Sequence, residues 1–141
     1  MKKLNKTASK IMEKIMSLNV SKIDNTEGSF MPLCVEVIGK VNGINKMAAM
    51  GSGRIISLAH YYEQNGDLMS DPEMIFFESE DIDKNKTYYP MSYSQDAFGI
   101  YRESIILDEK GELSKINRRE QADETSFANT WLKNIKSQQK L

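Results

Sequence analysis

Apolar residues recur at helical spacing near both ends of the chain. Within residues 1–22 they fall three and four positions apart, at Leu4, Ala8, Ile11, Met12, Ile15 and Met16. This spacing places them on one face and predicts a basic amphipathic helix over about 5–18. The same spacing of Phe127, Ala128, Trp131, Leu132 and Ile135 predicts a closing helix within 119–138, with Asp123 or Thr125 available to cap it.

The middle of the chain, residues 30–116, is instead rich in β-branched and aromatic residues between turn-forming residues. This composition predicts strands over 30–41, 44–50, 74–77, 98–107 and 112–116, and a loop over 79–86. Asn42-Gly43 and Asn65-Gly66 are typical hairpin turns. With the two helices, the pattern predicts a single α+β domain over 1–141, in which both helices pack on one face of an antiparallel sheet of about five or six strands.

Residues 54–64 fit two patterns. Ile55, Leu58, Ala59 and Tyr62 have helical spacing, whereas Ile56, Leu58, His60 and Tyr62 alternate as one face of a strand. The Ile-Ile and Tyr-Tyr pairs and the following Asn65-Gly66 favour the strand. We expect it to pair with 74–77 after a loop that ends in Asp71-Pro72.

Composition narrows the class of protein. The 141 residues are 40% hydrophobic and 28% charged, which is typical of a globular domain. Charged residues interrupt every apolar run near the start, so the sequence predicts no signal peptide and no membrane span, and we expect a cytoplasmic protein. Cys34 is the single cysteine, which excludes an internal disulfide and a multi-cysteine zinc site.

A net charge of −1 conceals a strongly asymmetric distribution of charge. Residues 1–22 carry six lysines against Glu13 alone, and residues 63–83 carry eight carboxylates with no lysine or arginine. Such fields affect partners and association rates. A solvated hairpin is one explanation of the acidic stretch and a binding surface is the other. Direct nucleic-acid binding through Lys2, Lys6, Lys10 and Lys14 is a less favoured possibility.

Candidate catalytic chemistry is sparse. The sequence contains no Ser-His-Asp order, no Cys-His pair and no zinc spacing, and Gly51-Ser52-Gly53 lacks the residues of a phosphate-binding loop. One alternative is a metal-dependent enzyme or small-ligand site centred on His60, Asp67, Asp71 and Glu73. We favour a structural interpretation, with His60 half-buried in the sheet and Asp67 bonding turn amides, and we expect no metal and no cofactor.

The central motif also carries a resemblance. His60-Tyr61-Tyr62-Glu63-Gln64-Asn65-Gly66-Asp67, followed by Asp71-Pro72-Glu73-Met74, resembles the pattern of a family of small uncharacterised bacterial domains carried on phages, plasmids and conjugative elements. Pro90, Gln95-Asp96, Phe127 and Trp131 extend the similarity over about residues 30–138. The resemblance implies a mobile-element context, and it implies neither a reaction nor catalytic residues.

These features lead to a functional hypothesis. We expect a non-enzymatic mobile-element protein that binds a host protein or ribonucleoprotein complex through an acidic central surface. Its concrete form is an inhibitor of a nucleic-acid-binding defence complex such as a CRISPR effector, because carboxylates can engage a channel that holds nucleic acid. The residues expected to bind the partner are Glu63, Asp67, Asp71, Glu73, Glu78 and Asp81.

Overall fold

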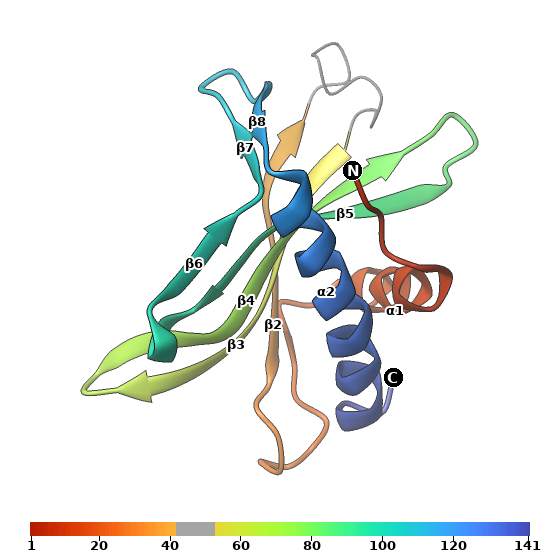
Figure 1. Cartoon of the computed structure of the whole chain (residues 1–141). Helices are drawn as coiled ribbons and strands as arrows, with labels where there is room; N and C mark the ends of the chain where they lie inside the picture. Colours follow the sequence, from red (N-terminus) through yellow and green to blue (C-terminus); the bar gives the residue numbers. More distant parts are fainter. Residues whose placement is uncertain (42–52) are drawn as a thin grey trace.

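The computed structural model describes residues 1–41 and 53–141, and it shows an α+β fold (Figure 1). The expected turn at Asn42-Gly43, the expected strand over 44–50 and the first two residues of Gly51-Ser52-Gly53 lie outside the described residues. The elements in chain order are α1 (Lys6–Ser17), β1 (Lys22–Ile23), β2 (Leu33–Val41), β3 (Gly53–Gln64), β4 (Asp67–Glu80), β5 (Lys86–Gln95), the 3-10 helix η1 (Asp96–Phe98), β6 (Ile100–Glu103), β7 (Ile105–Leu107), β8 (Leu113–Ile116) and α2 (Arg118–Gln138).

The described strands form two sheets. Strands β1 to β6 make a six-stranded sheet in chain order, with each strand antiparallel to the next, and β7 and β8 make a separate antiparallel pair. The prediction of an antiparallel sheet with one helix near each end of the chain is therefore confirmed.

Both helices pack against one face of the large sheet. Figure 1 shows α2 running across this face with α1 beside it. Met12 and Ile15 of α1 and Leu132 of α2 are fully buried against Leu58 and Phe76 of the sheet. The side chain of Asn5 caps α1 by accepting the amide N–H of Ala8 at 2.8 Å. The apolar stripes read from the sequence are thus the core-facing sides of the two helices.

The opposite face of the sheet is covered at one end by the β7–β8 pair. Ile105 of β7 is buried with Phe77 and Met91, which belong to β4 and β5. The expected single strand over 98–107 is wrong, because the chain divides at Ser104. The Ser104 amide N–H donates to the Met91 carbonyl at 2.9 Å, and its hydroxyl donates to Glu124 Oε1 of α2 at 2.7 Å, so β6 stays in the large sheet and β7 leaves it.

The central motif forms a continuous hairpin. Residues 54–64 are a strand, as the sequence favoured, and Asn65 (φ 53°) and Gly66 (φ 84°) make a two-residue turn. The expected loop before Asp71-Pro72 is wrong, since β4 already begins at Asp67. Pro72 is accommodated inside β4 because the β3–β4 register shifts beside it, so its missing N–H removes no ladder bond. The Asp71–Pro72 peptide is cis.

Two further expectations need correction. Helix α2 begins at Arg118, where the Asn117 side chain accepts the Glu120 amide at 3.1 Å, so neither Asp123 nor Thr125 is its cap. The loop between β4 and β5 is shorter than predicted because β4 continues to Glu80 and β5 starts at Lys86. No helix among the described residues is long and apolar enough to cross a membrane.

Candidate functional site

The six carboxylates predicted to bind a partner do not form one patch. Four of them lie on β4, whose 14 residues extend over roughly 45 Å: Asp67, Asp71, Glu73 and Glu78. Glu63 and Asp67 lie at the β3–β4 turn, whereas Asp81 lies beyond the opposite end of β4. A single flat partner surface therefore contacts one end or the other.

Glu78 is buried inside the protein. It is 3% exposed, and its Oε1 accepts the Arg54 Nε–H at 2.8 Å while its Oε2 accepts the Tyr88 hydroxyl at 2.8 Å. Lys86 Nζ lies 3.8 Å from the same carboxylate. Burial, together with the hydrogen bond to this anion, raises the pKa of Tyr88 above its ordinary range. These contacts give Glu78 a role in holding β3, β4 and β5 together.

Asp81 organises the loop between β4 and β5. Its Oδ1 accepts the amide N–H groups of Asp83 and Asn85, each at 2.9 Å. The Asp81 amide in turn donates to the Asn85 carbonyl at 3.0 Å. This is the local side-chain-to-backbone pattern typical of aspartate in turns.

The remaining four predicted carboxylates lie along the β3–β4 hairpin from its turn to Glu73, and η1 adds a fifth. We call this region the acidic end; its carboxylates are Glu63, Asp67, Asp71, Glu73 and Asp96. The chain segments that form it, residues 59–77 and 94–99, contain these five carboxylates and no lysine or arginine. The sequence thus predicted most of this region, and it missed Asp96 because contact between β4 and η1 is a product of the fold.

Three of these carboxylates are held by hydrogen bonds. Asp71 Oδ1 accepts from Gln95 Nε2 at 2.8 Å, and Asp96 Oδ2 accepts the Ser70 amide at 2.7 Å. Glu73 Oε2 accepts the Ser57 hydroxyl at 2.7 Å. The Tyr61 hydroxyl also donates to Glu73 at 3.4 Å, and burial followed by the charge of Glu73 raises the pKa of Tyr61 to about 12. These hydrogen bonds hold the side chains of Asp71, Glu73 and Asp96 in place.

Glu63 and Asp67 differ from these three. Both are exposed, and their carboxylates make no hydrogen bond or ion pair with any residue that the structure describes. The expectation that Asp67 bonds the turn amides is therefore wrong. The backbone conformation of Asn65 and Gly66 closes the turn without it. These two carboxylates are left with their full capacity to accept hydrogen bonds.

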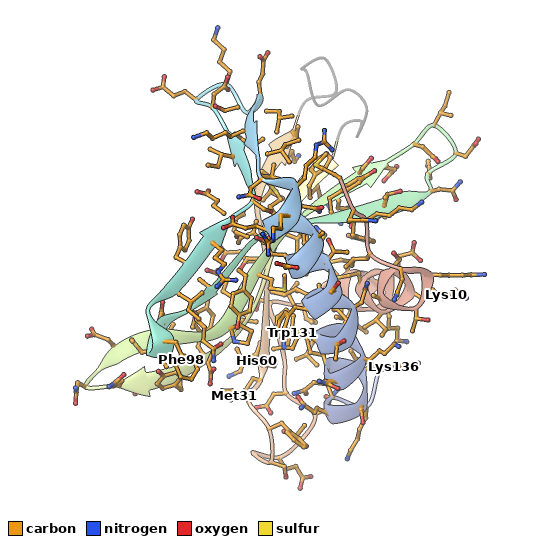
Figure 2. The ribbon with its side chains drawn as sticks, viewed as in Figure 1. Lys10, Met31, His60, Phe98, Trp131 and Lys136 are labelled. Carbon is orange, nitrogen blue, oxygen red and sulfur yellow. The ribbon has the colours of Figure 1, made fainter. Side chains whose placement is uncertain are left out.

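Apolar side chains are exposed beside the acidic end. Leu68 is 63% exposed, Phe98 is 72% exposed and Tyr101 is 67% exposed. Figure 2 shows Phe98 near the β3–β4 hairpin, on the opposite side of the view from Lys10 of α1. Sequence reasoning assigned Phe98 to a strand and gave Leu68 no role. The available signal was the position of Leu68 in the second residue pair from the hairpin turn, where solvent surrounds the strands.

His60 lies on the helix-covered face of the sheet. It is 5% exposed, its ring meets that of Trp131 at 5.6 Å, and its Nδ1–H donates to the Pro32 carbonyl at 3.0 Å (Figure 2). The prediction of a hydrogen-bonded structural histidine is confirmed, whereas the expectation that it is half-buried is wrong, because the side chain is buried against Trp131.

The structure does not bring the proposed metal ligands together. Met74 belongs to the core between the sheet and the helices, on the face of the sheet that also carries His60. Because successive side chains of a strand point to opposite faces, its neighbour Glu73 points to the other face. Asp67 lies at the distant turn. Within residues 1–41 and 53–141, no three His, Cys, Asp or Glu side chains form a group that could hold a metal ion. A site centred on His60 therefore has no geometric support in this part of the chain.

The fold and site define a small α+β domain with a charged, partly apolar end. The chain belongs to the family described as "Domain of unknown function (DUF6908)", whose model matches residues 1–141. The match confirms the resemblance to an uncharacterised domain and extends it to the N-terminal helix, which lay outside the similarity seen in the sequence. No curated protein and no solved structure matches the chain.

Proposed function

We propose that this protein is a non-enzymatic binding protein that engages a cationic surface of a cytoplasmic macromolecule through its acidic end. The proposal narrows the partner-binding set to Glu63, Asp67, Asp71 and Glu73, and adds the exposed side chains of Leu68 and Phe98. Glu78 leaves the set because it is buried, and Asp81 leaves it because it lies beyond the opposite end of β4, where its carboxylate organises the following loop.

The observation that carries the proposal is the contrast between bonded and free carboxylates. Glu78, Asp81 and Asp96 each accept hydrogen bonds within the fold, whereas Glu63 and Asp67 have no such partner among the described residues. An exposed apolar group beside them, Leu68, adds area that is removed from water on contact. Charge then governs the rate and the salt dependence of association, and apolar contact adds affinity.

The concrete form of the proposal is inhibition of a nucleic-acid-binding defence complex by a protein encoded on a mobile element. Free carboxylates on a projecting hairpin present negative charge as phosphates do, so they suit a channel lined with lysine and arginine. The mobile-element context comes from the resemblance of the central motif. The acidic end supports the contact with a cationic channel, whatever complex supplies it.

The test compares two variants that lose the same charge, one at the β3–β4 turn and the other around the opposite end of β4. Glu63→Gln with Asp67→Asn removes the two free carboxylates, and Glu80→Gln with Asp83→Asn is the matched control because both of its positions are exposed. An arginine-rich peptide serves as a defined cationic probe. Capture from host lysate, with this protein as the bait, identifies the partner.

We expect the first variant to lose affinity for the peptide and the partner, and the control to keep it. We also expect the affinity of the unaltered protein to fall as the salt concentration rises, because salt screens the attraction between opposite charges. The captured complex should lose binding of its own nucleic acid when the protein is added. Equal capture by both variants would contradict the role of the acidic end, and unimpaired nucleic-acid binding would contradict the inhibitor form.

A further inference from the structure

A groove lies between α1 and the end of α2, away from the acidic end. It has a volume of about 300 Å³ and is lined by Thr7, Lys10, Ile11, Lys14, Lys136 and Leu141. Figure 2 shows Lys10 projecting from α1 and Lys136 on the lower part of α2. Ile11 is 4% exposed and belongs to the core, and Leu141 packs against that core. The groove therefore has an apolar floor made by the protein's main core.

The rim of the groove is cationic. Lys10 and Lys14 are one helical turn apart on α1, and Lys136 comes from the last turn of α2. None of the three forms an ion pair within 4.0 Å in the described part of the chain. Residues 125–141 contain no aspartate or glutamate, and Glu13 of α1 lines a different cavity, with Arg54 and Lys84. Three lysines thus line one groove whose lining contains no aspartate or glutamate.

The chemistry of the floor and rim determines what fits. Three ammonium groups and the Thr7 hydroxyl can donate hydrogen bonds to a phosphate or carboxylate. Ile11 and Leu141 offer apolar contact that a bare inorganic anion cannot use. A volume near 300 Å³ is at the lower end of the range for small-molecule sites. No aromatic side chain lines the groove, so it lacks the stacking surface that favours single-stranded nucleic acid.

We propose that this groove binds a small anion carried on an apolar body, of the alkyl phosphate or alkyl carboxylate class. The head group contacts the Lys10, Lys14 and Lys136 ammonium groups, and the apolar body lies on Ile11 and Leu141. Because the two binding elements are the helices near the two ends of the chain, the ligand also joins α1 to α2. The site is independent of the acidic end.

The test uses the full chain with hexyl phosphate, inorganic phosphate and hexanol as separate probes. Calorimetry gives the affinities, and thermal unfolding followed by Trp131 fluorescence gives stabilisation by mass action. The binding variant is Lys10→Gln with Lys14→Gln and Lys136→Gln. The control variant is Lys3→Gln with Lys110→Gln, two exposed lysines that do not line the groove.

We expect hexyl phosphate to bind and to raise the melting temperature, with affinity lowered about tenfold or more by the binding variant and unchanged by the control. The Glu63→Gln and Asp67→Asn variant should bind it normally. Flotation with phosphatidylglycerol vesicles distinguishes the sources of the head group: lysine-dependent flotation indicates a lipid, and binding of hexyl phosphate without flotation indicates a soluble ligand. Equal binding of inorganic phosphate or hexanol, no binding of hexyl phosphate, or an unaffected binding variant would each overturn the proposal.

Discussion

His60 and Trp131 meet edge to face, with ring centroids 5.6 Å apart and an interplanar angle of 86°. The contact joins β3 of the sheet to α2, and the hydrogen bond from His60 Nδ1–H to the Pro32 carbonyl adds the segment before β2. The one histidine of the chain is thus fixed by three separate parts of the fold. Its position explains why it belongs to the packing of the domain rather than to its acidic end.

His60→Ala should lower the free energy of unfolding by about 1 to 3 kcal/mol, because it removes the ring contact and leaves the partly buried Pro32 carbonyl without its donor. Asp67→Ala should change it by less than about 0.5 kcal/mol, since its exposed carboxylate has no partner in the described structure. Urea unfolding followed by Trp131 fluorescence measures both. A neutral His60→Ala beside a destabilising Asp67→Ala would reverse the roles assigned to these residues.

The amphipathic patterns predicted the helices and strands well because they depend on neighbours in the sequence. The stripe from Ala8 to Ile15 and the alternation from Ile56 to His60 each report a buried face directly. The continuous course of β4 through Pro72 was not predictable in this way. A proline normally interrupts a central strand, and only the register shift against β3 makes room for it.

Glu78→Ala should be among the most destabilising single changes, at about 2 to 4 kcal/mol. It leaves the Arg54 guanidinium and the buried Tyr88 hydroxyl without their acceptor, and breaking a buried ion pair costs more than the pair contributes. Glu80→Ala, at an exposed position of the same strand, is the control and should fall within about 0.5 kcal/mol of the unaltered protein. Thermal and urea unfolding of the two variants test this, and similar stabilities would show that the Glu78 cluster contributes little.

The candidate site was predictable in its charge and not in its geometry. The sequence shows a run of carboxylates from Glu63 to Asp83 without showing which of them the fold uses. Glu78 is buried because its register places it between Arg54 and Tyr88, which are 24 and 10 residues away in sequence. Long-range pairing of this kind has no local pattern, so the division into bonded and free carboxylates required the structure.

Gly53→Ala should disrupt the pairing of β3 with β4. A Cβ built at Gly53 would lie 1.7 Å from the Glu78 carbonyl oxygen, so the two strands would have to separate. Gly39→Ala is a matched control in β2, because the nearest atom to a Cβ there would be Ile55 Cδ1, at an ordinary 3.6 Å. We expect a loss of more than about 3 kcal/mol for the first variant and less than about 1 kcal/mol for the second. Equal melting temperatures for the two variants would contradict the close strand approach at Gly53.

Glu124 should make the stability of the domain depend on pH near neutrality. The side chain is 4% exposed, and its Oε2 has no hydrogen-bond partner in the described structure. Burial, assisted by the charges of Glu120 and Asp123, raises the pKa of Glu124 from 4.5 to about 7, although the Ser104 hydrogen bond and Arg102 act in the opposite direction. The folded state therefore holds this proton more tightly than the unfolded chain does.

The sign of the pH effect follows from this raised pKa. The contribution of protonated Glu124 is complete below about pH 4.5 and is lost as the pH rises to about 7, where the folded carboxyl ionises. Glu124→Gln keeps the acceptor for Ser104 and cannot ionise, so it should be more stable than the unaltered protein at pH 8, by about 1 to 2 kcal/mol, and similar to it at pH 5. Urea unfolding at the two pH values measures the difference, and Glu109→Gln, an exposed carboxylate, controls for net charge. A gain from Glu124→Gln that is equal at pH 5 and pH 8 would show that ionisation of this buried carboxyl is not its cause.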